Sequence, residues 1–196
     1  MHRSKLFVAA AALAVAFAVP AFADEPTGIR KEYLASLDDA GGKLQELAGA
    51  MPQGKFAWRP MKGVRSTAEV FMHVAGANYG IPAFFGVMPP PSAGIDMAHF
   101  QDWEKSTSDK AKVQTLLKDS YAHIHKIISD TPDSDLDTEV NLFGMKMTKR
   151  AAFLLIVSHT HEHLGQAIAY ARMNKITPPW TAREEAAAKK AAAEKK

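Results

Sequence analysis

Apolar residues recur at helical spacing along four long stretches of the chain. The first stretch carries Tyr33, Leu37 and Leu44 on one side, with polar residues between them. The second begins at Ser66-Thr67-Ala68-Glu69, a serine followed three residues later by a glutamate, which is the pattern of a helix-capping box. We therefore predict four long helices, over residues 29–51, from Ser66 towards Pro82, over residues 108–130, and from the cap Thr148 to about Asn174.

The connecting segments contain little other regular structure. The stretch TEVNLFGMKM over residues 138–147 alternates around Gly144 and predicts a short hairpin. The segment GVMPPPSAG is rich in proline and glycine, and DMAHFQDWEK after it is at most a short irregular helix. These patterns predict an all-α fold, an antiparallel four-helix bundle with a short hairpin before the last helix.

Both ends of the chain differ in composition from the bundle. Arg3 and Lys5 precede the apolar run LFVAAAALAVAFAV, and Ala21 and Ala23 form an A-x-A-like cleavage site. We predict a cleaved signal peptide over residues 1–23, a bundle domain over 24–180 and a charged Ala/Lys-rich tail over 181–196. A retained membrane anchor is the alternative interpretation of the apolar run. Cleavage places the protein in the periplasm or outside the cell, with no membrane span remaining.

Composition narrows the chemistry that the domain is able to perform. The chain contains no cysteine, which excludes a thiolate nucleophile, thiolate metal ligands and a covalently attached c-type haem. Its net charge of +3 lies in the leader and the tail, and residues 24–180 carry only about −1. We therefore expect no nucleic-acid partner, because such proteins need a concentrated basic surface.

The segment SHTHEHLGQ in the fourth predicted helix contains three histidines at alternate positions. A helix turns by about 100° per residue, so His159 and His163 lie one turn apart on the same face, whereas His161 points to the other side. That shared face also carries Ala152, Ile156 and Ala167, so the pair interrupts an apolar stripe. Two imidazoles at this spacing are suited to bind one metal ion, and a hydrogen-bonded pair in the core is the alternative.

His73 is the candidate for a third ligand. It lies among Val70, Met72, Val74 and Ala77 in the second predicted helix, where a solvated position is not expected. A single histidine in such a place is often a core residue with its own hydrogen bonds. Together with the pair on the fourth helix, however, it completes a set of three protein ligands that leaves positions open on a metal.

Other side chains are weaker candidates for the site. His123 and His125 point about 200° apart, so at most one of them is able to face inward, and we expect both at the surface. His99 lies in an irregular segment, where at most it lines the mouth of a pocket. Glu162 is close in helical phase to His159, which makes it a candidate base or partner of a ligand. Asn78 and Tyr79 are further neighbours to test.

Three segments resemble the DinB/YfiT-like superfamily of metal-binding four-helix bundles. They are AWRP at 57–60, RSTAEVFMHVAGAN at 65–78 and HTHEHLGQAIAYARMNKITPP at 159–179. The resemblance implies an up-down-down-up bundle, often a homodimer. It also implies His73, His159 and His163 as ligands of a divalent ion (zinc, nickel, iron or manganese), followed by the signature Gly165-Gln166. An exported location and the basic tail depart from that family pattern.

These observations lead to a hypothesis of function. We expect an exported, hydrolytic metalloenzyme in which three histidines hold a divalent ion whose free positions accept water or a small-molecule substrate. A non-catalytic bundle that binds metal or a small ligand in the cell envelope is the main alternative. Some members of the resembled family are thiol-dependent transferases, but an exported protein would lack the cytoplasmic thiol.

Overall fold

The computed structural model describes residues 26–195, so the predicted signal peptide over residues 1–23 lies outside the described residues. Four long helices dominate: α1 (Gly28–Ala50), α2 (Thr67–Ala83), α4 (Lys110–Asp130) and α5 (Lys149–Met173). Two shorter helices are α3 (Phe100–Trp103) and α6 (Pro179–Ala193). Single 3-10 turns occupy Gln53–Lys55, Pro91–Ala93, Met97–His99 and Asp133–Asp135.

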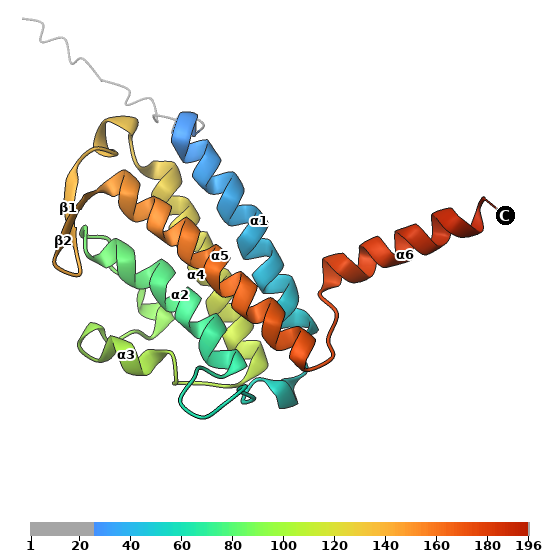
Figure 1. Ribbon diagram of the computed structural model, residues 1–196. Helices are drawn as coiled ribbons and strands as arrows, with labels where there is room; N and C mark the ends of the chain where they lie inside the picture. Colours follow the sequence, from blue (N-terminus) through green and yellow to red (C-terminus); the bar gives the residue numbers. More distant parts are fainter. Residues whose placement is uncertain (1–25, 196) are drawn as a thin grey trace, which may run out of the picture.

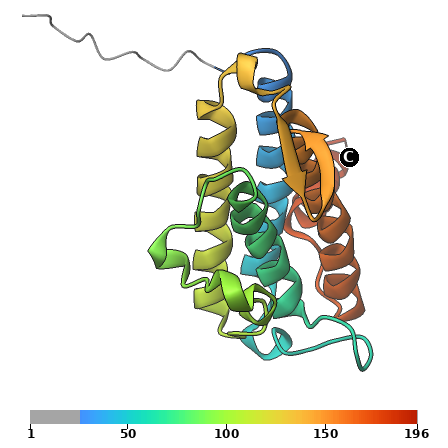
Figure 2. The same ribbon diagram turned by 90° about the vertical axis from the view of Figure 1, so that its left-hand side faces the viewer.

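The four long helices form the predicted bundle. Each packs against two others, in the ring α1, α4, α2, α5. Helices α1 and α5 run in one direction and α2 and α4 in the other, which is the up-down-down-up order (Figures 1 and 2). Because α2 and α4 are parallel, the chain between them must return along the length of the bundle. This long connection contains α3, and it contributes to the candidate site described below.

Side-chain caps fix where three of the four long helices, α2, α4 and α5, begin. The Ser66 hydroxyl accepts from the Glu69 amide at 3.2 Å, and the Glu69 carboxylate accepts from the Ser66 amide at 2.8 Å, so the predicted capping box is confirmed. Thr148 caps α5 by accepting from the Ala151 amide at 3.2 Å, also as predicted. The cap of α4 is Asp109, so this helix begins slightly later than the sequence pattern indicated.

The predicted hairpin is also present. Strands β1 (Glu139–Leu142) and β2 (Met145–Thr148) pair antiparallel, with Leu142 opposite Met145. The two turn residues, Phe143 and Gly144, have φ of 53° and 83°. A two-residue hairpin with both φ values positive is the turn whose twist matches that of the strands, and it leaves the Phe143 ring exposed at the tip.

The core lies between the four long helices and is built mainly from aliphatic and aromatic side chains. Phe56, from the loop after α1, closes one end and packs against Phe71 with ring centroids 6.1 Å apart. Phe153 is fully buried in α5, against Phe85 at 5.8 Å. The largest fully buried side chains are Tyr79, Phe56, Phe71, Phe153, Leu44, Leu47, Met51, Met72, Leu117, Ile124, Ile128 and Leu142.

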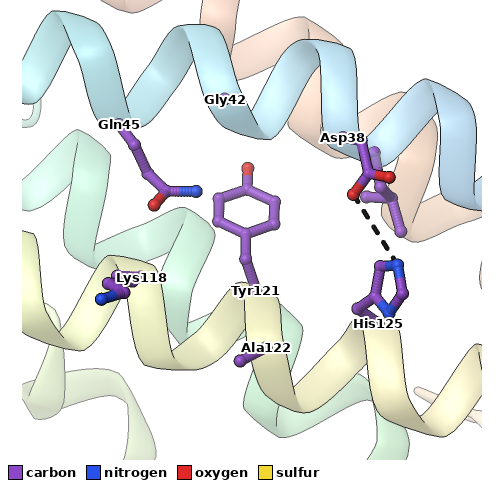
Figure 3. Close-up of a pocket in the computed structure, with 8 residues that line it drawn as sticks. Asp38, Gly42, Gln45, Lys118, Tyr121, Ala122 and His125 are labelled. Carbon is purple, nitrogen blue, oxygen red and sulfur yellow. Dashed lines mark ion pairs between the residues drawn. The ribbon is translucent and has the colours of Figure 1, made fainter.

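Helix α1 continues through Gly41 and Gly42, and only the first of these glycines has a close neighbour. A Cβ atom at Gly41 would lie 2.6 Å from the Tyr121 ring of α4, whereas one at Gly42 would meet nothing within 4 Å. Figure 3 shows the Tyr121 ring pointing from α4 towards α1. Gly41 therefore lets this buried ring approach the backbone of α1.

We expect Gly41→Ala to lower the free energy of unfolding by about 1–2 kcal/mol, because the displaced ring costs more than the helix gains from alanine. Gly42→Ala, the matched control, should instead raise stability by up to about 1 kcal/mol. Urea unfolding followed by circular dichroism measures both changes. Equal effects of the two substitutions would contradict the close packing of Tyr121.

Helix α6 extends away from the bundle (Figure 1). It covers most of the alanine-rich and lysine-rich tail, and none of its residues is fully buried. Arg183 pairs with Glu46 of α1 at 2.9 Å. Among residues 26–195, no helix has both the length and the apolar character needed to cross a membrane.

Candidate metal centre

The three histidines that the sequence analysis proposed as metal ligands lie close together in the structure. His73 comes from α2, and His159 and His163 lie one turn apart on α5. One ring nitrogen from each falls within 4.8 Å of the other two. The Nε2 atoms of His73 and His159 are 3.0 Å apart. Two nitrogens bound to one ion at about 2.0–2.1 Å lie roughly 3.0–3.4 Å from each other, so this pair already has the spacing of two ligands.

The far side of two of these rings is held by a hydrogen bond. His73 Nδ1 lies 2.9 Å from Glu104 Oε2, and His163 Nδ1 lies 2.8 Å from Gln166 Oε1. Both oxygens are acceptors, so each Nδ1 carries the proton and each Nε2 keeps its lone pair. These hydrogen bonds fix the orientation of both rings, so that the Nε2 lone pairs of His73 and His163 are available to bind a cation.

Burial and the neighbouring basic groups keep the rings of His73 and His159 neutral. Burial, the nearby Arg65 and His163 lower the pKa of His73 to about 4. Burial, followed by the neighbouring His163 and His73, lowers the pKa of His159 to about 3. The contact from His73 to Glu104 is therefore a hydrogen bond from a neutral imidazole. Neutral imidazoles are the form of histidine that binds metals, so His73 and His159 are ready to accept a cation at neutral pH.

Gln166, the polar residue that follows the histidine pair, makes hydrogen bonds on both sides of its amide group. Its Oε1 accepts from His163, and its Nε2 donates to the Tyr170 hydroxyl at 3.1 Å. That hydroxyl in turn donates to the backbone oxygen of Arg65 at 3.1 Å. A chain of hydrogen bonds thus joins His163 of α5 to the loop before α2.

Glu104 reaches His73 because the segment containing α3 packs closely on α2. A Cβ at Gly80 would lie 2.6 Å from the Phe100 ring, and one at Gly76 would lie 3.5 Å from the rings of Phe100 and Trp103. The Trp103 indole donates to the Ala93 backbone oxygen at 3.0 Å, which fixes the segment. These two glycines, one turn apart, leave the room in which α3 sits.

Sequence reasoning did not find Glu104. It follows Trp103 in a segment without helical periodicity, so nothing local placed it near His73. Glu104 also accepts from the Arg65 guanidinium at 3.1 Å, and its side chain is only 19% exposed. The carboxylate therefore connects Arg65 to His73 and holds the imidazole in place.

We expect Glu104→Gln to weaken metal affinity by about 10–100-fold, because the partner of a ligating histidine sets its orientation and basicity. Isothermal titration with zinc measures the change. Glu162→Gln is the matched control, since Glu162 is an exposed carboxylate beside the histidine pair on α5. A loss of affinity that is the same in both variants would show that only the overall charge matters.

The remaining candidates are not members of the histidine cluster. Glu162 is exposed, Asn78 donates to Ser120 at 3.2 Å, and Tyr79 packs against Trp103. The expectation that both His123 and His125 are at the surface was wrong for the first. His123 is partly buried against the Tyr79 ring at 5.2 Å, and burial lowers its pKa.

Three further histidines are exposed. His125 lies 3.8 Å from the Asp38 carboxylate in the cavity of Figure 3, which is formed by α1 and α4. His99 contacts Asp96 at 2.7 Å and does not reach the cluster. His161 faces away from the pair, as its helical phase predicted, and its Nδ1 lies 2.8 Å from the Val157 oxygen.

Two cavities adjoin the candidate site. One, of about 360 Å³, opens beside His73 and is walled by aromatic and apolar groups together with charged ones. The other, of about 590 Å³, is lined mostly by charged and polar residues, among them Gln166, the partner of His163. Arg65, Glu104 and Lys105 line both cavities, so these residues form the wall between them.

The fold and the site define a class: a four-helix bundle with a three-histidine cluster that is suited to a divalent ion. A family model described as the DinB superfamily matches residues 36–167. The chain therefore belongs to the DinB superfamily, as its sequence resemblance implied.

Solved structures agree with this assignment. A DinB-like protein from Bacillus cereus ATCC 10987 is 17% identical, with 76% of this chain and 95% of that chain covered and a TM-score of 0.61. A DinB-like protein from Bacillus subtilis is 20% identical, with coverage of 74% and 93% and a TM-score of 0.58. At these identities the likeness shows the fold alone. A comparison with curated proteins finds no match.

Proposed function

We propose that this DinB-superfamily protein is an exported metal-dependent hydrolase in which His73, His159 and His163 hold a divalent ion. The observation that carries the proposal is the convergence of three imidazoles, from two helices, within 4.8 Å. Three protein ligands leave coordination positions open, and an ion bound in this way lowers the pKa of water and polarises a substrate oxygen.

The surrounding residues have defined roles in this proposal. Glu104 and Gln166 keep the Nδ1 protons of His73 and His163 in place, which directs both Nε2 lone pairs to the ion. The cavity beside His73 gives a substrate access to the site. Glu104 is also the carboxylate closest to the ligands on that cavity wall, so it is the candidate to accept a proton during hydrolysis.

Hydrolysis fits the predicted export better than thiol transfer does. An exported protein meets water but not the low-molecular-weight thiols of the cytoplasm, and the chain has no cysteine of its own. The export step has its own test. Mass spectrometry of the protein from the periplasm or medium should find Asp24 at the amino terminus, and an intact leader there would contradict cleavage.

The experiment for the catalytic proposal is a hydrolase screen on protein reconstituted with zinc, nickel, iron or manganese. We expect hydrolysis of some ester, amide or lactone that is lost on chelation and restored by the metal. Glu162→Gln should retain this activity, and Glu104→Gln should reduce it. Hydrolysis that is unchanged by chelation would contradict a metal-dependent reaction.

A non-catalytic ligand-binding bundle is the second candidate function. The observation in its favour is the apolar part of the cavity beside His73, formed by Met72, Phe100, Trp103 and Phe143. Such a surface retains a small molecule without any chemistry. Stoichiometric metal and ligand binding without turnover across the screen would support this candidate over the hydrolase.

A further inference from the structure

The cavity beside His73 has two chemically different parts. One part is apolar and aromatic, with the rings of Phe100 and Trp103 next to Gly76, and Phe143 also lines the cavity. The other part is charged and contains Arg65, Glu104 and Lys105. At about 360 Å³, the cavity has the size of a site for a small organic molecule. An occupant that fits both parts has an apolar body and a charged end.

The charges on this wall determine which sign that end should have. Arg65 is already neutralised by Glu104 at 3.1 Å, and in the adjoining cavity Arg59 is neutralised by Glu69 at 2.9 Å. Lys105 belongs to neither pair and is not among the cations that the structure pairs with a carboxylate within residues 26–195. The wall therefore carries one uncompensated positive charge.

Lys105 is well placed to use that charge. It directly follows Glu104, and it lines the same cavity as the candidate ligand His73, so an anion beside it shares the cavity with that histidine. Its side chain is exposed and the ammonium remains hydrated, so binding an anion there requires little desolvation. A single ammonium acts as a point charge and suits one carboxylate, whereas a phosphate more often has several donors.

We propose that the cavity binds small carboxylates with an aromatic or apolar body, and that Lys105 is the residue that recognises the carboxylate. The aromatic wall holds the body, and Lys105 places the charged end at the boundary with Glu104. Binding of such carboxylates does not depend on the proposed function. If the protein is the proposed hydrolase, these carboxylates are its class of substrate or product, and only this step rests on that proposal.

A matched pair of probes tests this proposal: phenylacetate and its neutral isostere phenylacetamide. Their dissociation constants are measured by NMR titration on the full mature chain, both zinc-loaded and metal-free. We expect the wild-type protein to bind phenylacetate about ten-fold more tightly than the amide in both forms, and this preference should weaken at high salt.

Variants assign the preference to particular residues. Lys105→Gln should bring the two probes to within about two-fold of each other, since the charge is lost and the aromatic wall remains. Lys112→Gln is the matched control, because Lys112 is an exposed lysine of α4 that does not line this cavity, and it should leave the preference unchanged. Phe100→Ala should weaken both probes alike, because it shortens the apolar wall.

Several outcomes would overturn the proposal. They are no binding of either probe, equal binding of both by the wild type, or a preference that survives in Lys105→Gln. A preference seen only with zinc would assign the carboxylate to the metal instead of Lys105. A preference that persists in the metal-free protein would support the proposal even if the hydrolase screen finds no reaction, so the two failures are distinguishable.

Discussion

Replacing both His159 and His163 with alanine should leave the purified protein with almost no bound divalent metal, whereas the wild type should hold about one ion per chain. The two substitutions remove two of the three imidazoles that converge within 4.8 Å, and a single remaining histidine binds metal weakly. Elemental analysis of protein purified from the exported fraction measures the stoichiometry. Titration with zinc, nickel, iron and manganese then establishes which ion binds most tightly.

A control variant must show that metal is lost because the histidines are absent and not because the protein is unfolded. His161→Ala is the matched control, because His161 lies between the pair on α5 but faces solvent. It should bind metal like the wild type. Far-ultraviolet circular dichroism should show the same helix content in all variants, since α5 is anchored by fully buried Phe153 and Ile156. Equally low metal in wild type and double variant would refute the metal centre.

The helical pattern of the sequence was sufficient to predict the pairing within α5. Residues one turn apart share a face whatever the tertiary structure, so the separation of His159 and His163 from His161 needed no coordinates. The same local logic predicted the Ser66 cap and the turn at Gly144. These features depend on residues that are close in sequence, which explains why they could be predicted.

Contacts between distant segments could not be predicted in this way. Glu104 contacts His73 only because the long connection between α2 and α4 packs α3 against Gly76 and Gly80 of α2. The hydrophobic periodicity of the sequence carries no signal for this contact. His123 shows the same limit, because its contact with Tyr79 depends on how α4 packs on α2. The third histidine of the cluster, His73, was identified because its apolar neighbours argued against a solvated position.

Binding of zinc should raise the thermal midpoint of unfolding of the metal-free protein by about 8–16 °C when free zinc is about a thousand times its dissociation constant. Mass action gives about 4 kcal/mol at that ratio, and for a domain of this size one kcal/mol shifts the midpoint by about 2–4 °C. Differential scanning calorimetry of the chelated and reloaded protein measures the shift. The size of the shift depends on free zinc, so it should grow with the logarithm of the zinc concentration.

The position of the site predicts where this stabilisation acts first. The cluster joins α2 to α5, whereas α1 and α4 carry none of its histidines, so amide hydrogens near the junction of α2 and α5 should gain the most protection from exchange. The variant lacking His159 and His163 should show neither the thermal shift nor the local protection. A similar midpoint shift in that variant would mean that zinc stabilises the bundle through other surface groups, and the three histidines would lose their role as its binding site.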